Sequence, residues 1–173
     1  NQFGLLVSDG RYGSYTANVI SHNLESGIAV RSTDGIEISG NVVQANGING
    51  LSIQDASAVV KNNFISDNGD RGIGILSFQG VITANTIVRN RLYNLGIEGD
   101  ADVSAPGNWW GAGDVKKTIF DKENDPAKGR AAYLPVLTEP LPFVWPQRTI
   151  RSDTMWHDSI LVSGTVNVEP GSV

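Results

Sequence analysis

Asparagine recurs along this chain every 22 or 23 residues, with the same apolar and small residues around it. A fifth copy begins at Asn108, and an irregular one ends at Ala17. Repetition at a fixed period indicates a stack of similar units, each burying its apolar face against its neighbours. The four regular copies are 18–40, 41–62, 63–84 and 85–107.

Each copy holds three short runs in which every second residue is apolar, separated by Gly, Asn, Asp and Ser. Such alternation indicates β-strands joined by turns. A propeller blade needs about 40–45 residues, and a leucine-rich repeat needs a leucine pattern and a helical segment that no copy shows. The sequence therefore predicts an all-β parallel β-helix with three short strands per coil, each strand paired with its equivalent about 4.8 Å away.

The repeat breaks after Asn108, where most of the prolines lie. We expect the β-helix and its closing segment, an irregular cap, to span 1–137, followed by a proline-rich linker over 138–152. Alternation resumes over 153–173, which predicts the start of a second β segment or a returning hairpin. Because the chain has no initiator Met and no signal-peptide pattern, we expect a processed product or an excised fragment.

The repeated asparagines need an explanation, because asparagine is a poor strand former and is costly when buried unpaired. In a coil stack, each carboxamide can donate to the next and accept from the previous one. The alternative, a polar groove, fits less well, because the register points these residues inward with the isoleucines. The sequence predicts a first ladder of Asn18, Asn41, Asn63, Asn85 and Asn108 and a second ladder of Asn23, Asn46, Asn68 and Asn90.

Turning the chain at each corner calls for residues that tolerate a left-handed conformation. The ladder asparagines are candidates, as are Gly27, Gly50 and Gly72. In the fourth copy Asn94 stands where the others have this glycine.

The composition excludes several kinds of partner. The chain has 13 basic and 18 acidic residues, a net charge of −5, which argues against nucleic acid and anionic membrane surfaces. No run of about eighteen apolar residues is present, so no membrane insertion is expected. The absence of cysteine excludes disulfides and thiolate-bound metals. The outward positions gather no carboxylate set for calcium or for glycoside hydrolysis, so we expect no metal site and no cofactor.

Two surface features could contact a ligand. Small residues line the outward row of the second strand, which is either a strip for another chain or a sugar, or simply a crowded face. Charged residues gather near one corner, where an arginine beside acids could bind carbohydrate or could simply be solvated. The small row is Ala29, Ser52, Gly74 and Gly96, and the candidate carbohydrate contacts are Asp67, Asp70, Arg71, Arg89, Arg91 and Tyr93.

The aromatic residues and histidines leave two interpretations open. Exposed tryptophan can stack on a sugar ring, whereas buried tryptophan can cover the open end of a β-helix, and we favour the cap. Neither histidine has a partner motif for catalysis. The residues are Trp109, Trp110, Trp145 and Trp156, and His22 and His157.

The repeated pattern N-x-I-x-x-N…G-I-x-I, closed by "NWWG" and by Ile119, Asp121, Asp125 and 133–135, resembles the right-handed parallel β-helix repeat proteins of the pectate-lyase-like superfold. These include the carbohydrate-binding and sugar-hydrolase repeat group and the NosD-type maturation proteins. The resemblance implies a right-handed coil and a secreted, periplasmic or cell-surface location. It carries over no catalytic motif, since Arg89-Asn90-Arg91 does not fit the expected spacing.

Two functions follow as hypotheses. The first is a non-catalytic structural or surface-interaction module of an exported protein, with a polysaccharide or another surface protein as partner. The alternative is a carbohydrate-binding or polysaccharide-degrading protein, a lyase or hydrolase. A fold of this kind hosts both, so the site has to decide between them.

Overall fold

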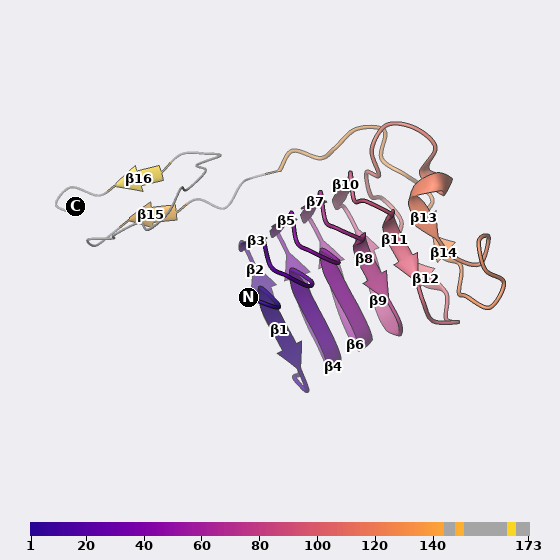
Figure 1. The fold of residues 1–173 in the computed structure, drawn as a ribbon, viewed down its shortest axis with the longest axis horizontal. Helices are drawn as coiled ribbons and strands as arrows, with labels where there is room; N and C mark the ends of the chain where they lie inside the picture. The colour runs from indigo at the N-terminus through magenta and orange to yellow at the C-terminus, as the bar shows by residue number, and fades with distance from the viewer. Residues whose placement is uncertain (144–147, 151–165, 169–173) are drawn as a thin grey trace.

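The computed structural model describes residues 1–143, 148–150 and 166–168. Strands dominate, with a single short 3₁₀ helix among the described residues (Figure 1). The elements are β1 (Leu5–Ser8), β2 (Ser14–Thr16), β3 (Val19–Ser21), β4 (Ile28–Ser39), β5 (Val42–Gln44), β6 (Leu51–Lys61), β7 (Phe64–Ser66), β8 (Arg71–Ile75), β9 (Phe78–Thr83), β10 (Thr86–Val88), β11 (Tyr93–Ile97), β12 (Val103–Ser104), η1 (Val115–Thr118), β13 (Ile119–Phe120), β14 (Ala131–Ala132), β15 (Arg148–Ile150) and β16 (Val166–Val168).

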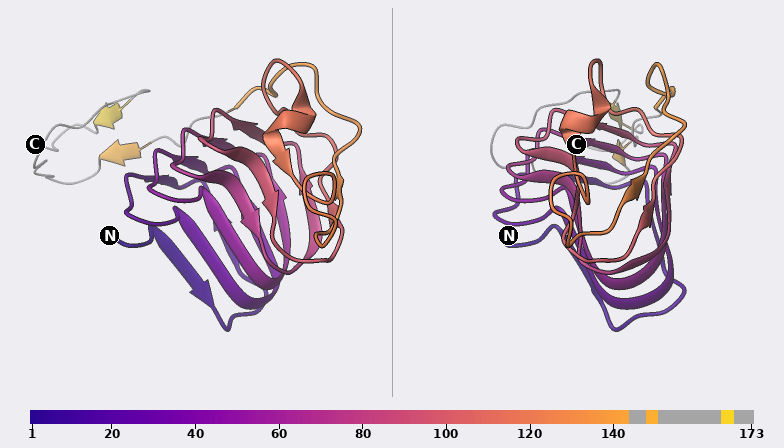
Figure 2. Two further views of the ribbon diagram at one scale, coloured as in Figure 1. Left: turned by 45° about the vertical axis from the view of Figure 1, so that its right-hand side comes forward. Right: turned by 90° about the vertical axis from the view of Figure 1, so that its right-hand side faces the viewer.

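The strands stack in parallel, each on its equivalent one coil further along. One sheet runs β1-β4-β6-β8-β11-β13, and β2 and β9 join it by pairing with β4 and β6. A second sheet runs β3-β5-β7-β10. In the second sheet Val43 pairs with Ile20 on one side and with Ile65 on the other, as the alignment on asparagine requires. The predicted parallel β-helix is confirmed, and Figure 2 shows its coils stacked along one axis.

The predicted division into three strands per coil is modified in two coils. The second and third runs join there into one long strand, β4 with 12 residues and β6 with 11. Ser32 and Asp55 bend these strands with φ near 50° and keep the pairing to the next coil. In the following coils the two runs are separate strands, β8 with β9 and β11 with β12. A single left-handed residue can therefore replace a whole turn.

The inward positions form the core. Equivalent aliphatic residues lie above one another from coil to coil, and from β4 onward the column that begins at Ile28 is at most 3% exposed. Their burial is the main stabilising term of a stack whose coils cannot fold alone. One such column is Ile28, Leu51, Ile73, Leu95 and Ile119.

The corner residues differ from the prediction. At the two corners that carry the ladders, the residue directly before each ladder asparagine is left-handed, whereas the ladder asparagines and Gly27, Gly50 and Gly72 do not have positive φ. The glycines serve close packing instead. A Cβ on Gly50 would lie 2.7 Å from the Gly72 carbonyl oxygen and 2.8 Å from Asn68 Nδ2. The left-handed positions are Ala17, Gly40, Asn62, Ala84 and Gly107 before the first ladder and His22, Ala45, Asp67 and Arg89 before the second.

Part of the outer face of the β3-β5-β7-β10 sheet is buried, although Val19 in β3 is 45% exposed. Val42, an outward residue, is 0% exposed, and Thr86 is 5% exposed. Phe143 contacts this face, with its ring centroid 5.9 Å from that of Phe64. Chain that follows the closing segment therefore returns along the stack (Figure 1).

The far C-terminal part is described only in β15 and β16, which pair in parallel with each other. Trp145, Trp156 and His157 lie outside the described residues. The division into 1–137, 138–152 and 153–173 stays a prediction. Within the part of the chain that the structure describes, no helix has the length and apolar character to cross a membrane.

Candidate functional site

The two asparagine ladders form as predicted. In each step an asparagine donates both its backbone N–H and its Nδ2 to Oδ1 of the next, as Asn41 does to Asn63 at 2.9 and 3.0 Å. Nδ2 of Asn63 also donates to the carbonyls of Ile38 and Lys61 at 2.9 and 3.0 Å. Because these groups are buried and paired with one another, the ladders hold the coils in register and are not available to a ligand.

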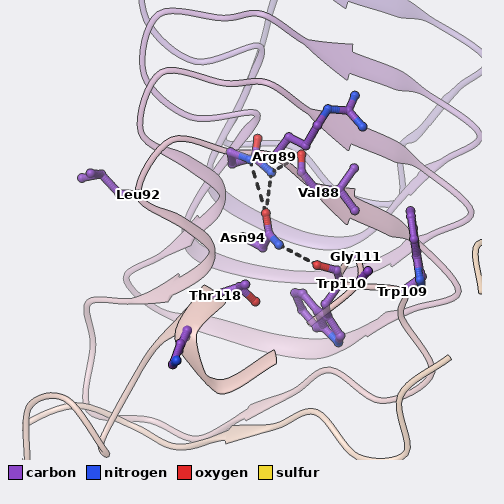
Figure 3. A pocket seen from close by; sticks show the side chains of 11 residues that line it. Val88, Arg89, Leu92, Asn94, Trp109, Trp110, Gly111 and Thr118 are labelled. Carbon is purple, nitrogen blue, oxygen red and sulfur yellow. Dashed lines mark hydrogen bonds between the residues drawn. The ribbon is translucent and has the colours of Figure 1, made fainter. Parts of the chain in front are cut away.

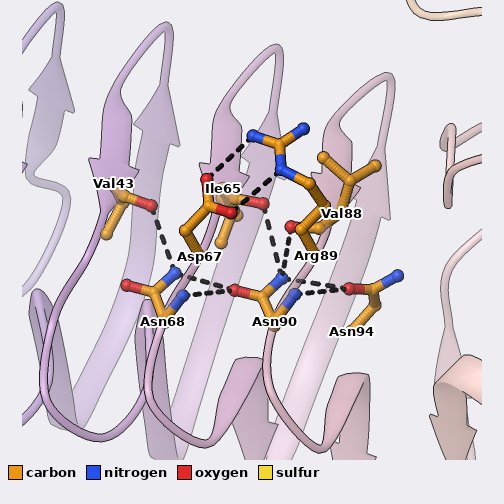
Figure 4. A network of polar contacts seen from close by, with 8 residues as sticks. All are labelled: Val43, Ile65, Asp67, Asn68, Val88, Arg89, Asn90 and Asn94. Carbon is orange, nitrogen blue, oxygen red and sulfur yellow. Dashed lines mark hydrogen bonds and ion pairs between the residues drawn. The ribbon is translucent and has the colours of Figure 1, made fainter.

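The second ladder ends in a way that the sequence did not reveal. Asn90 donates through Nδ2 to Oδ1 of Asn94 at 3.0 Å, within the same coil (Figure 4). Asn94 Nδ2 then donates to the carbonyl of Trp110 at 3.0 Å. Asn94 replaces the repeat glycine because it supplies the acceptor that a fifth rung would have supplied.

The six candidate carbohydrate contacts separate into unconnected groups. Arg89 and Asp67 form a two-point ion pair, with Nε and one terminal nitrogen donating at 2.9 and 2.8 Å (Figure 4). The hydrogen bonds from Arg89 are the main reason that the pKa of Asp67 is lowered, and those to Asp67 raise the pKa of Arg89. Both groups are therefore held in their charged forms.

Arg71 belongs to a different cluster. Its guanidinium pairs with Asp70 at 3.0 Å and also with Glu98. The side chain lies across the small row, since a Cβ on Gly96 would lie 2.3 Å from Arg71 Nε. The Asn49 carboxamide covers Gly74 in the same way, 3.0 Å from such a Cβ. The small row is therefore a crowded face filled by the protein's own side chains.

The remaining two candidates do not complete either cluster. Tyr93 packs on Phe120 with ring centroids 5.4 Å apart, and Arg91 is exposed. A further ion pair joins the C-terminal ends of β4 and β6. Glu37 accepts from Ser39 at 2.8 Å and pairs with Lys61 at 3.3 Å, and these contacts lower the pKa of Glu37. In the described ranges, no three His, Asp or Glu side chains are placed to hold a metal ion.

A cavity of about 420 Å³ lies where the regular repeat ends. One wall is the turn from Val88 to Leu92, and the other comprises Trp109, 110–112 and η1 (Figure 3). Arg89 and Lys117 bring positive charge to its lining. Its size falls within the range of small-ligand pockets. Sequence reasoning found Arg89 and Trp109 but missed Lys117 and Leu92, and the break in the repeat after Asn108 was the signal that pointed here.

The two adjacent tryptophans differ in burial, and each fits one of the two interpretations, a cap of the β-helix or a contact for a ligand. Trp110 is 3% exposed and packs into the core at the last coil, which is the predicted cap. Trp109 is half-buried, continues the outward row of β10 through a bridge to Thr86, and lines the cavity. Of these two adjacent tryptophans, Trp109 is therefore the one that a ligand could contact.

Asp121 organises the closing segment. Asp121 is 5% exposed, and its carboxylate accepts from the amides of Glu123 and Ala131, both at 2.9 Å. A buried carboxylate that accepts several backbone N–H groups fixes a loop and is not available as a base.

Comparison with known proteins settles the family. A sequence profile described as "Right handed beta helix region" matches residues 1–109. The chain belongs to the right-handed β-helix family. The more specific resemblance to the pectate-lyase-like superfold and to NosD-type proteins stays a prediction. None of the curated proteins matches this β-helix in sequence.

Among solved structures, the β-helix is similar to the crystal structure of the periplasmic alginate epimerase AlgG. The two share 16% sequence identity with a TM-score of 0.46. The match covers 80% of this chain and 38% of that chain. This β-helix therefore spans well under half the length of that protein.

Proposed function

We propose that this chain is a non-catalytic β-helix module of an exported protein, which serves as a structural spacer and an interaction surface. The observation that carries the proposal is the pairing of outward charges with one another along the stack. Asp67 pairs with Arg89, and Lys61 with Glu37, each pair joining neighbouring coils. Such pairs link neighbouring coils and hold these two carboxylates in ion pairs.

The titration behaviour supports the same proposal. A general acid or base works best with a pKa near the operating pH. The pKa values of Asp67 and Glu37 are lowered and that of Arg89 is raised, so each shift moves the group away from neutral pH. Charged surface groups of this kind suit a scaffold that has to stay ionised and soluble.

A turnover assay on polyuronates tests the proposal. The full chain should release no product above the buffer control, for either lyase or hydrolase chemistry. Turnover that Arg71→Ala abolishes, but that the matched exposed-site variant Arg130→Ala retains, would overturn the non-catalytic function. Arg71 is the informative position because it is the arginine that contacts two carboxylates.

Carbohydrate binding without turnover is the second candidate. It is favoured by Trp109 and Arg89 in the lining of one cavity, because an aromatic face and an arginine together can hold a sugar ring. Titration with oligosaccharides, followed by tryptophan fluorescence, should then give a saturable change that Trp109→Ala removes.

A further inference from the structure

The turn after the first strand of each coil follows one hydrogen-bonding rule. Two of its carbonyls, two residues apart, accept from two consecutive amides of the next coil. Gly69 and Asp70 donate in this way to the carbonyls of Asn46 and Ile48, at 2.8 and 2.7 Å. The rule holds at three successive interfaces, the others being Gly47 and Ile48 onto Asn23 and Glu25, and Arg91 and Leu92 onto Asn68 and Asp70.

At the fourth interface the rule predicts that consecutive amides should reach the carbonyls of Asn90 and Leu92. By the repeat these amides would belong to Gly113 and Asp114. Within the described part of the chain, no donor reaches either carbonyl. The fifth coil departs from the repeat there, because Asn94 ends the second ladder and the chain folds into η1 instead.

The cavity lies in the place left by this missing turn. Asn90, Leu92, Trp109 and Lys117 all line it, and Figure 3 shows Leu92 and Trp109 at opposite ends of the lining. Leu92 is 55% exposed, so the cavity has an apolar rim. Lys117 is exposed and makes no ion pair with a described residue. The lining of the cavity thus includes two residues whose carbonyls accept from no described donor, an apolar side chain, an aromatic side chain and a positive charge without an ion-pair partner among the described residues.

We propose that this cavity binds a turn of a partner protein, which carries two consecutive free amides and an acidic side chain. The partner's amides donate to the carbonyls of Asn90 and Leu92, and its carboxylate pairs with Lys117. The partner turn therefore completes the coil that the chain leaves open, a form of strand addition at the end of a sheet. The inference rests on the proposed function, since it names the surface through which the module interacts.

The spacing of the acceptors favours a peptide over a sugar. Three interfaces of the same molecule show that a backbone turn satisfies both carbonyls at 2.7–3.0 Å. Sugar hydroxyls could also donate, but nothing in the repeat defines a spacing for them. In each earlier coil, the two equivalent carbonyls accept from the turn of the following coil. A peptide turn is therefore the ligand that best matches the cavity.

The test uses a cyclic peptide that contains residues 66–73, because this turn already makes both hydrogen bonds to the coil before it. It is titrated into the full chain, labelled with ¹⁵N, and chemical shifts are followed. Changes should centre on Asn90, Leu92 and the Trp109 indole. A peptide with N-methyl groups on the Gly69 and Asp70 amides should bind at least about tenfold more weakly, because it lacks both donors.

Charge reversal supplies the matched pair of variants. Lys117→Glu should weaken the peptide about tenfold, whereas Lys122→Glu, an exposed lysine outside the cavity, should leave its affinity unchanged. Equal binding of the N-methylated peptide, no binding, or shifts elsewhere would overturn the inference. Oligosaccharides that shift the Trp109 signals when the peptide does not would overturn it in favour of the second candidate. Turnover in the polyuronate assay would instead reject the proposed function, independently of peptide binding.

Discussion

The two asparagine ladders run side by side through the same coils, yet they end differently. The first has one rung in every coil, and its last, Asn108, donates through Nδ2 to the carbonyls of Ile82 and Ala105 at 2.8 and 2.9 Å. The second ends when Asn94 folds back under Asn90 from four residues away. A ladder can therefore be closed either by one more coil or by a local substitution.

The difference extends to burial and to the surroundings. The first ladder is at most 1% exposed from Asn41 onward, whereas Asn90 in the second is only half-buried. The second ladder ends at the cavity, because the chain leaves the repeat at its last rung and Asn90 and Asn94 both line it. The first ladder should thus contribute more to stability, and the second should tolerate change.

The largest effect is expected for Asn63→Leu, in the middle of the first ladder. Leucine removes the acceptor for two donors of Asn41 and the donor to Ile38, all in a site that is 1% exposed. The free energy of unfolding should fall by about 3–5 kcal/mol in urea denaturation, because each unpaired buried group costs about 1–3 kcal/mol. Asn18→Leu at the exposed first rung should cost below about 1 kcal/mol. Equal losses at the two positions would show that burial does not distinguish the rungs.

A smaller effect is expected for Asn94→Gly, which restores the repeat residue. Asn90 then loses the acceptor of its amide, and the Trp110 carbonyl loses its donor. Because Asn90 is only half-buried, water can replace part of its bond, whereas the Trp110 carbonyl stays buried, so the loss should be about 1–2 kcal/mol. Asn62→Gly, at a left-handed position outside both ladders, is the control and should change stability by less than about 0.5 kcal/mol. A silent Asn94→Gly would mean that the second ladder needs no terminal acceptor.

The smallest effect is expected for Asp67→Asn, beside the second ladder. The side chains of Asp67 and Arg89 are 45% and 61% exposed, so the pair should contribute about 0.5 kcal/mol. Because folding lowers the pKa of Asp67, its contribution is present above the ordinary aspartate pKa of about 4 and is lost as the pH falls through the folded value. Urea denaturation should therefore separate the variant from the wild type at pH 7 but not in acid. A difference that persists when the carboxylate is protonated would assign it to something other than the ion pair.

Much of the fold was predictable, because each coil repeats the same pattern of apolar residues, asparagine and glycine. The spacing of Asn41, Asn63 and Asn85 indicated the register, and the alternation of residues such as Leu51 and Ile53 indicated the core. Because equivalent positions repeat within the chain, aligning the copies of a single sequence is enough to predict the strand register and the core.

What could not be predicted depends on contacts between positions that do not repeat. Nothing around Val42 indicates that its outward side chain is buried, and nothing around Phe64 indicates that Phe143, from a non-repeating segment, packs against it. Nor does Arg71 reveal that it lies across Gly96 one coil away. Asn94 was recognised as a departure from the repeat, but its role requires knowing where the Trp110 carbonyl lies. The cavity is a consequence of the same departure.

Every carboxamide-to-carboxamide bond between coils runs in the same direction, with Nδ2 of the N-terminal asparagine donating to Oδ1 of the next. The stack therefore has a chemical polarity. At its N-terminal end, Oδ1 of Asn18 and of Asn23 accept from no described residue, whereas at the other end the ladders terminate as donors to backbone carbonyls. Coils of this kind can extend one another only head to tail, because two N-terminal ends would bring acceptor against acceptor.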